Sequence, residues 1–176
     1  MSKNVKPPVT IALKDANILI DLVNASILGN WFALGYRTVT TNMVIQEVKA
    51  GDQWVVINQF IASGQLEVID LNSSQVALIY TQYGNVTVSA ADKSVLVIAE
   101  EIGATLLTGD MKVRREGFER EFDVRGILWV YDELISRSAI TYAQAIESLE
   151  NMVSKGAWLP NEEVEKRLKL WNSMMH

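Results

Sequence analysis

The sequence lacks cysteine, and its single histidine, His176, is the last residue. The absence of cysteine excludes disulfides, thiolate metal ligands and a cysteine nucleophile, and it is consistent with a reducing cytoplasm. One histidine cannot form a histidine-based metal site or a Ser-His-Asp triad within one chain. Triad hydrolases and zinc sites built on cysteine or histidine are therefore excluded.

Long apolar runs are also missing. Polar residues interrupt every apolar stretch before the roughly 18 residues that a membrane-spanning helix needs. The N-terminal segment MSKNVKPPVTIALKD has no extended apolar region and no cleavage site of small residues. We therefore expect no signal peptide, no membrane span and a cytoplasmic location.

The chain has no excess of positive charge. Its 21 acidic and 16 basic residues give a net charge of −5 and an isoelectric point of about 4.9. Such a chain, taken as a whole, repels a phosphate backbone. A nucleic-acid substrate would have to approach a local basic strip or a bound cation.

The sequence pattern is that of an α/β protein. The 176 residues, 49% of them hydrophobic, suffice for one domain, with a core over about residues 9–125 and a helical extension over about 126–176. Short apolar and β-branched runs predict strands at 9–13, 37–41, 66–71, 104–108 and 122–124, with helices between them. This alternation predicts a three-layer α/β/α sandwich, in which helices cover both faces of a central parallel sheet.

Only helices are expected after the last strand. Residues 127–136 form one, and two amphipathic helices follow it. Offsets of 0, 4, 7 and 11 relate the apolar positions in each of these two, which are Tyr142, Ile146, Leu149 and Val153, then Val164, Leu168, Trp171 and Met175. The sequence therefore predicts a C-terminal αα-hairpin, with its turn at residues 156–160.

Two acidic residues follow predicted strands. Asp15 comes directly after the first strand, and Asp110 comes almost directly after the strand at 104–108. Open parallel sheets form their sites outside the carboxyl ends of the strands, so both residues are expected at one edge. Each of them is also a candidate N-cap for the helix that follows.

Two further acids lie on apolar stripes of predicted helices. Asp92 precedes Val95 by three residues, and Glu47 follows Val44 by three. A carboxylate on a core-facing stripe is costly unless a partner compensates it, and neither stripe carries a basic residue. Asp92 also completes a capping box with Ser89, whereas Glu47 in mid-helix has no capping role.

Four converging carboxylates would repel one another and raise at least one pKa. A Mg²⁺ or Mn²⁺ ion removes this conflict, because hard divalent ions prefer carboxylate oxygens and keep water ligands for substrate phosphates. One or two such ions can polarise a phosphodiester and deprotonate an attacking water.

These segments, in order, resemble the motifs of the PIN-domain ribonucleases, many of which are toxins of toxin–antitoxin pairs. They are Asp15-Ala-Asn17-Ile-Leu-Ile-Asp-Leu, Val44-Ile-Gln-Glu47-Val, Ser89-Ala-Ala-Asp92 and Leu106-Leu-Thr108-Gly-Asp110. The resemblance covers about residues 9–125. The helical tail after Gly126 is similar, more loosely, to the extended tail of one PIN subgroup.

The resemblance implies a catalytic metal site for cleavage of RNA phosphodiester bonds. The implied ligands of Mg²⁺ or Mn²⁺ are Asp15, Glu47, Asp92 and Asp110. Asn17 and Thr108 would orient ligands or water. Gly109 stands where many relatives have a second Asp or Asn, so a second metal position stays open. Surplus apolar surface on the last helices would suit a homodimer or an antitoxin protein.

Basic residues follow Asp110 and are candidates for binding RNA. They are Lys112, Arg114 and Arg115. The same residues can instead pair with acids of their own charged helix, such as Glu116 and Glu119.

The sequence therefore predicts a divalent-metal-dependent ribonuclease, the toxin of a toxin–antitoxin pair. The alternative is a catalytically inactive PIN-fold module that binds RNA or a protein, which Gly109 and the acidic net charge favour. A phosphate-accepting receiver domain is disfavoured, because no lysine stands at the end of the last strand, where that fold needs one.

Overall fold

The computed structural model describes residues 9–13, 16–49, 52–157 and 159–175. Its strands are β1 (Thr10–Leu13), β2 (Arg37–Thr41), β3 (Leu66–Ile69), β4 (Thr105–Leu107) and β5 (Val124–Arg125). Its helices are α1 (Ala16–Asn24), α2 (Leu28–Ala33), α3 (Asn42–Val48), α4 (Trp54–Ala62), α5 (Ser73–Tyr80), α6 (Ala90–Ile102), α7 (Met111–Glu119), α8 (Ile127–Ser136), α9 (Tyr142–Ser154) and α10 (Asn161–Ser173).

The strands form one parallel sheet in the order β3-β2-β1-β4-β5, which confirms the predicted α/β fold. β1 lies at its centre, and Ile11, Ala12 and Leu13 are completely buried. The register pairs Leu13 of β1 with Leu107 of β4, so these strands end level with each other. On the other side, the Thr40 hydroxyl of β2 donates a hydrogen bond to the Leu13 carbonyl oxygen (2.9 Å). The carboxyl ends of the three inner strands therefore form one common edge.

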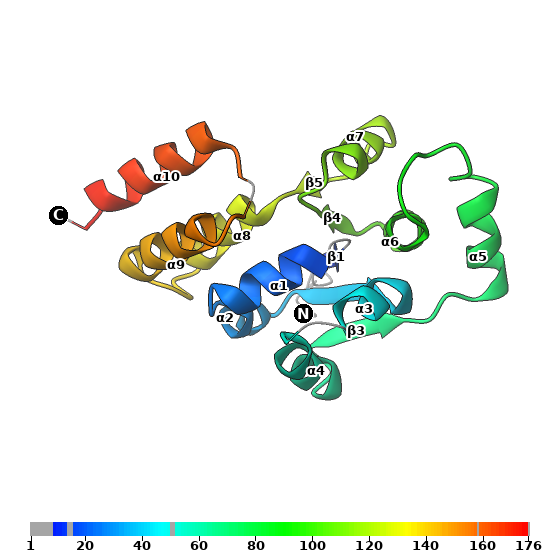
Figure 1. Ribbon diagram of the computed structural model, residues 1–176, viewed down its shortest axis with the longest axis horizontal. Helices are drawn as coiled ribbons and strands as arrows, with labels where there is room; N and C mark the ends of the chain where they lie inside the picture. The colour runs from blue at the N-terminus through cyan, green and yellow to red at the C-terminus, as the bar shows by residue number, and fades with distance from the viewer. Residues whose placement is uncertain (1–8, 14–15, 50–51, 158, 176) are drawn as a thin grey trace, which may run out of the picture.

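Helices cover both faces of this sheet. Right-handed crossovers place the helices that connect β1 to β2 on one face, and the helices that connect β3 to β4 and β4 to β5 on the other. Figure 1 shows α1 and α2 on one side of the strands, and α5 with α6 on the other. α6 packs against β1, β2 and β4, while α3 contacts both α1 and α6. α3 therefore lies at the edge of the sheet, where the two layers meet.

The C-terminal helices extend the molecule at one end (Figure 1). α8 packs against α2, α9 against α8, and α10 against α9, so the predicted hairpin of α9 and α10 is present. The predicted stripe of α9 is partly wrong, because Ala145, Ser148, Leu149 and Met152 are its buried residues and Val153 is 41% exposed. Small side chains at positions 145 and 148 suit a helix packed between two others. No helix in the described ranges is long and apolar enough to cross a membrane.

Two further details differ from the sequence expectations. The short helix α2 was not expected, although it buries Leu28, Trp31 and Phe32. β5 begins two residues later than the expected strand at 122–124. Its register explains the shift, since the Leu106 and Thr108 amides donate to the carbonyl oxygens of Asp123 and Arg125.

α7 packs closely on the sheet because residue 117 is glycine. A Cβ atom at Gly117 would lie 2.7 Å from Val124 Cγ2 and 3.2 Å from Leu106 Cδ2. The branched Val124 side chain in β5 has little freedom to move away. Gly29 in α2 provides a contrast, because a Cβ there would meet only Phe60 Cζ, at 3.9 Å.

We predict that Gly117→Ala lowers the free energy of unfolding by about 1–3 kcal/mol, because overpacking outweighs the better helix propensity of alanine. The matched variant Gly29→Ala should leave stability unchanged or raise it by up to about 1 kcal/mol. Urea unfolding of both variants measures the difference. Equal stabilities would contradict the close packing of α7.

Candidate active site

Three segments that carry acidic residues begin at the carboxyl edge of the sheet. α3 starts where β2 ends, and α7 starts just after β4. The first turns of α6 reach the same edge, because Ser94 Oγ lies 2.6 Å from Thr41 Oγ1 at the end of β2. Glu47, Asp92 and Asp110 belong to these segments. Asp15, the fourth predicted ligand, lies outside the described residues.

Asp92 is half-buried in the first turn of α6. Its Oδ2 accepts a hydrogen bond from the Ser89 amide (3.0 Å), and its own amide donates to Ser89 Oγ (3.1 Å). The capping box weighed from the sequence is therefore present. A carboxylate has about four acceptor positions, so the cap and a cation can use the same side chain.

Asp110 is the N-cap of α7. Its Oδ1 accepts hydrogen bonds from the amides of Lys112 (2.7 Å) and Val113 (3.2 Å). Thr108 is completely buried, and its hydroxyl accepts a hydrogen bond from the Asp110 amide (3.1 Å). Thr108 thus fixes the backbone that carries the Asp110 carboxylate.

Glu47 does not lie on the buried stripe of α3, so that expectation is wrong. The buried residues are Val44, Ile45 and Val48, whereas the Glu47 side chain is exposed. At about 100° per residue, Glu47 points roughly 100° away from the centre of this stripe. The proposal that Glu47 is a metal ligand therefore depends on its position in α3 and on the sequence motif. The free-energy cost of burying its carboxylate no longer supports it. Asn17, the second residue of α1, is likewise exposed.

The donor atoms at this edge fit a hard divalent cation. They are oxygens of carboxylates, a hydroxyl and an amide, which Mg²⁺ and Mn²⁺ prefer. Asn42 Oδ1, at the start of α3, is buried and accepts no hydrogen bond from the described residues, which leaves this oxygen available to a cation or a water molecule. Within the described ranges, which omit Asp15, no three acidic side chains are close enough to hold a metal ion.

The predicted RNA-binding residues divide into two groups. Arg115 Nε pairs with Glu119 Oε1 at 3.0 Å, so the pairing within the helix weighed from the sequence is present for this residue. Lys112 and Arg114 have no acidic partner in the described part of the chain. Arg114 Nη1 instead donates to the Thr108 carbonyl oxygen (3.3 Å), which holds its guanidinium beside the end of β4.

Two grooves flank the start of α7. The larger, about 770 Å³, lies between residues 85–88 and the outer face of α7. The smaller, about 450 Å³, runs from Thr108 and Gly109 across β5 and α8 to α10. Met111 and Arg114 line both grooves, so the carboxyl edge of β4 opens on two sides.

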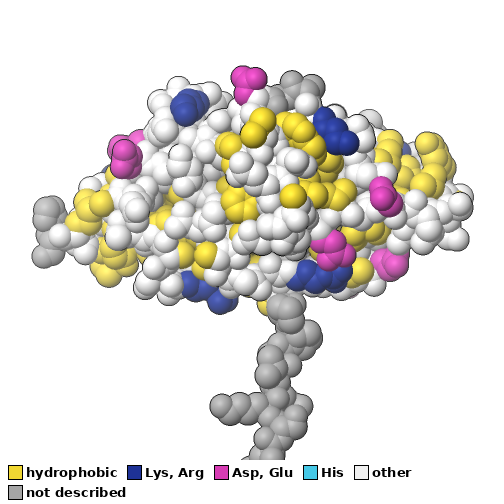
Figure 2. Space-filling model, turned by 90° about the horizontal axis from the view of Figure 1, so that it is seen from below, with side chains coloured by type: hydrophobic (Ala, Val, Ile, Leu, Met, Phe, Trp, Pro, Cys, Tyr) yellow, Lys and Arg dark blue, Asp and Glu magenta, His cyan; other side chains and the backbone are white. Residues whose placement is uncertain are grey.

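On the face drawn in Figure 2, apolar patches lie among basic and acidic side chains, and neither sign of charge dominates.

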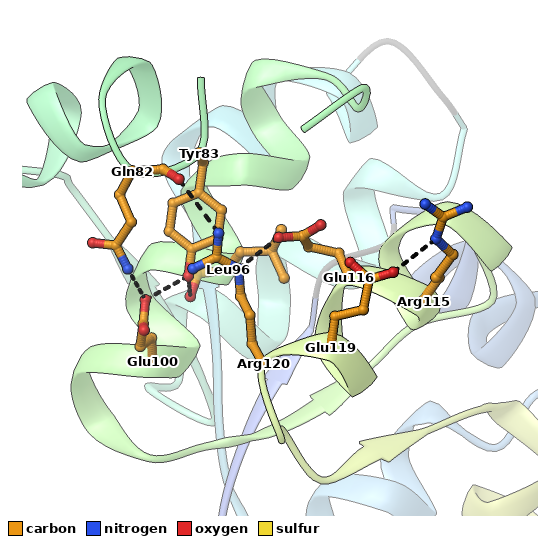
Figure 3. A network of polar contacts seen from close by, with 8 residues as sticks. All are labelled: Gln82, Tyr83, Leu96, Glu100, Arg115, Glu116, Glu119 and Arg120. Carbon is orange, nitrogen blue, oxygen red and sulfur yellow. Dashed lines mark hydrogen bonds and ion pairs between the residues drawn. The ribbon is translucent and has the colours of Figure 1, made fainter. Parts of the chain in front are cut away.

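A polar network holds the C-terminal end of α7 against α6 (Figure 3). Tyr83 is completely buried, and its hydroxyl donates to Glu100 Oε2 (2.6 Å). Arg120 lies over the Tyr83 ring, 4.0 Å from its centroid, and donates to the Gln82 carbonyl oxygen and to Glu116. Burial, and then the bond to Glu100, raise the pKa of the Tyr83 hydroxyl above its ordinary value. The network fixes the segment after α5 relative to α7.

Sequence reasoning missed the grooves and the aromatic residue on α7. Phe118 is 56% exposed and lines the larger groove. Its ring centroid lies 5.7 Å from the Arg114 guanidinium carbon. The four-residue spacing of Arg114 and Phe118 was the available signal, since such residues are neighbours on a helix surface.

Two comparisons with known proteins agree with the fold described above. The family described as "DUF3368: PIN domain" matches residues 11–173. The crystal structure of PAE2754 from Pyrobaculum aerophilum is similar, with a TM-score of 0.51 and 15% identity over 74% of this chain and 99% of that one. At this identity the similarity shows the fold alone. No curated protein matches the sequence significantly. Because the family match includes all five strands and the C-terminal hairpin, the chain belongs to the PIN-domain family.

Proposed function

We propose that this protein is a divalent-metal-dependent ribonuclease that hydrolyses RNA phosphodiester bonds. One observation carries the proposal: acid-bearing segments start at one sheet edge, directly beside two cations, Lys112 and Arg114, that have no acidic partner among the described residues. Membership of the PIN-domain family supports the same reaction class.

In this proposal Asp15, Glu47, Asp92 and Asp110 hold Mg²⁺ or Mn²⁺. Such an ion, when bound, polarises a phosphodiester and lowers the pKa of an attacking water. The chain itself supplies positioning. The Thr108 hydroxyl and the first amides of α7 hold the Asp110 carboxylate in one orientation. Asp92 is held in the same way by Ser89.

The cations serve the substrate. An RNA phosphate next to the acidic edge meets repulsion from a chain of net charge −5. Lys112 and Arg114 reduce this repulsion at the one place where cleavage is proposed. Arg114 is already fixed through Thr108, so little side-chain entropy is lost when it binds phosphate.

A second candidate function is a binding module without catalysis. The capping interactions favour it, because Asp92 and Asp110 each have a structural role that needs no metal. In the nuclease the negative charges of Asp92 and Asp110 bind the metal ion, whereas in the binding module their side chains serve only as helix caps. The variants below distinguish these two roles.

We predict that Asp92→Asn lowers metal-dependent cleavage of single-stranded RNA by at least about 100-fold, since even residues that only support a ligand cost 10–100-fold when lost. Asparagine keeps the acceptor oxygen for the Ser89 amide, so the protein should remain folded. The assay measures initial rates with Mg²⁺ or Mn²⁺, with and without chelator.

The matched control is Ser89→Ala, which removes the cap and keeps the carboxylate. It should lower stability by about 1 kcal/mol and retain cleavage well below the melting temperature. Equal activity of the wild type and Asp92→Asn, or activity that chelator does not abolish, would exclude the proposed mechanism.

A second prediction concerns metal binding without substrate. Excess Mn²⁺ should raise the melting temperature, because a ligand present at about 100 times its Kd stabilises the native state by about 2.7 kcal/mol. Asp110→Asn should lose most of this shift and keep the helix cap, since asparagine is also a good N-cap. Differential scanning calorimetry measures both proteins. A wild type that Mn²⁺ does not stabilise would favour the binding module.

The roles of toxin and homodimer, and an antitoxin partner, also belong to this proposal and depend on the family resemblance. Induced expression of the wild-type chain should arrest bacterial growth, whereas Asp92→Asn should allow it. Matched protein levels on an immunoblot are the necessary control. Growth arrest by both proteins would show that toxicity does not need the carboxylate.

A further inference from the structure

We propose that the groove between α7 and residues 85–88 binds a single RNA strand beside the cleavage position, with phosphates on Lys112 and Arg114 and a base stacked on Phe118. This inference depends on the proposed function for its choice of ligand. It adds a substrate-strand site and a stacking residue, Phe118.

The charges of the groove select a ligand with negative charges. Two acids line it, and each has a basic partner, since Glu116 pairs with Arg120 and Glu119 with Arg115. The remaining charges that line the groove are those of Lys112 and Arg114. Both lie in the first turn and a half of α7, where the helix dipole adds to their positive potential.

Apart from Asn85 and Thr87, the rest of the groove is apolar and fits a planar group. Phe118 and Met111 are 56% and 62% exposed, and Val86 and Val88 form the opposite wall. The Arg114 guanidinium beside the Phe118 ring links the cationic and the aromatic parts. A nucleotide has the same two parts, because its phosphate is charged and its base has a flat face that stacks on aromatic side chains.

The groove is held open before any ligand binds. Its walls belong to different segments, and the Arg120 contacts in Figure 3 join them. Arg120 belongs to the end of α7, and it contacts the Gln82 carbonyl oxygen and the Tyr83 ring on the segment that leads to residues 85–88. A preformed groove costs less entropy to fill than one that must assemble around its ligand.

The position of the groove favours RNA over an acidic peptide. Its cationic end is the first turn of α7, directly after the Asp110 cap. A strand cleaved at that edge must continue along one of the two flanking grooves, and this one offers a base-stacking surface. A duplex keeps its base faces paired and stacked internally, so only a single strand can use Phe118.

The test measures binding without cleavage. Fluorescence anisotropy of a labelled ten-nucleotide RNA in excess chelator gives Kd for the full-length protein and its variants. Phe118→Ala should weaken binding of the single strand about 10-fold, and Phe118→Trp should restore it. Binding of a duplex of the same sequence should not change. Leu170→Ala, which removes a side chain of similar exposure on α10, is the matched control and should bind like the wild type.

Salt dependence tests the phosphate contact. Lys112→Ala should reduce the slope of log Kd against log salt by about 0.7, the value for one phosphate contact on a single strand. Phe118→Ala should leave the slope unchanged, because a stacked base releases no counterion.

Three results would overturn the inference: a Phe118→Ala affinity equal to that of Leu170→Ala, an equal loss for single-stranded and duplex RNA, or a Phe118→Trp variant as weak as the alanine variant. An occupant other than RNA would produce the first result. The proposed function fails on a separate measurement. If Asp92→Asn does not change cleavage but Phe118 still contributes to binding of single-stranded RNA, the nuclease proposal is wrong and the proposed RNA groove is supported.

Discussion

Two buried hydroxyl groups, those of Thr41 and Ser94, meet at the carboxyl edge of the sheet, and both side chains are completely buried. The Val44 amide donates to Thr41 Oγ1, and Ser94 Oγ donates to the Ala91 carbonyl oxygen. Because the Ser94 hydroxyl proton is used in its bond to Ala91, the Thr41 hydroxyl must be the donor in the bond between Thr41 and Ser94. A buried polar group left without a partner costs about 1–3 kcal/mol, so this chain of hydrogen bonds has one stable direction. It joins the first turn of α3 to that of α6, and the positions of Glu47 and Asp92 depend on it.

Local signals in the sequence were sufficient for much of the fold. The strand–helix alternation, the Ser89 capping box and the left-handed Gly103 that ends α6 are all present as expected. Each depends on residues close together in the chain, where propensity and capping decide the structure. The exposed side of α3 and the buried side of α9 were harder. Periodicity gives the spacing of apolar residues, but the neighbouring helices decide which side they cover.

The candidate site shows the same division. Sequence order identified Thr108 and Asp110, and the structure adds the hydrogen bonds that position them. It also distinguishes the basic residues of α7, because Glu119 compensates the Arg115 charge and no acid in the described part of the chain compensates the Lys112 charge. The amino-acid composition gives the net charge but does not show which charged residues pair. A chain with a negative net charge can therefore still present cations at one edge of the sheet. The groove beside Phe118 needs the Arg120 contacts between distant segments, and no local pattern encodes those.

The Asp110 cap also has a thermodynamic consequence. The carboxylate proposed to bind the cation receives the first amides of α7, and the outer side of the same helix forms one wall of the larger groove. Close packing at Gly117 holds this helix against β4 and β5. If the ion and the strand both favour one position of α7, linkage makes their effect reciprocal: the factor by which one changes the affinity of the other is the same in both directions. Such coupling needs no direct contact between ion and strand, only the helix that they share.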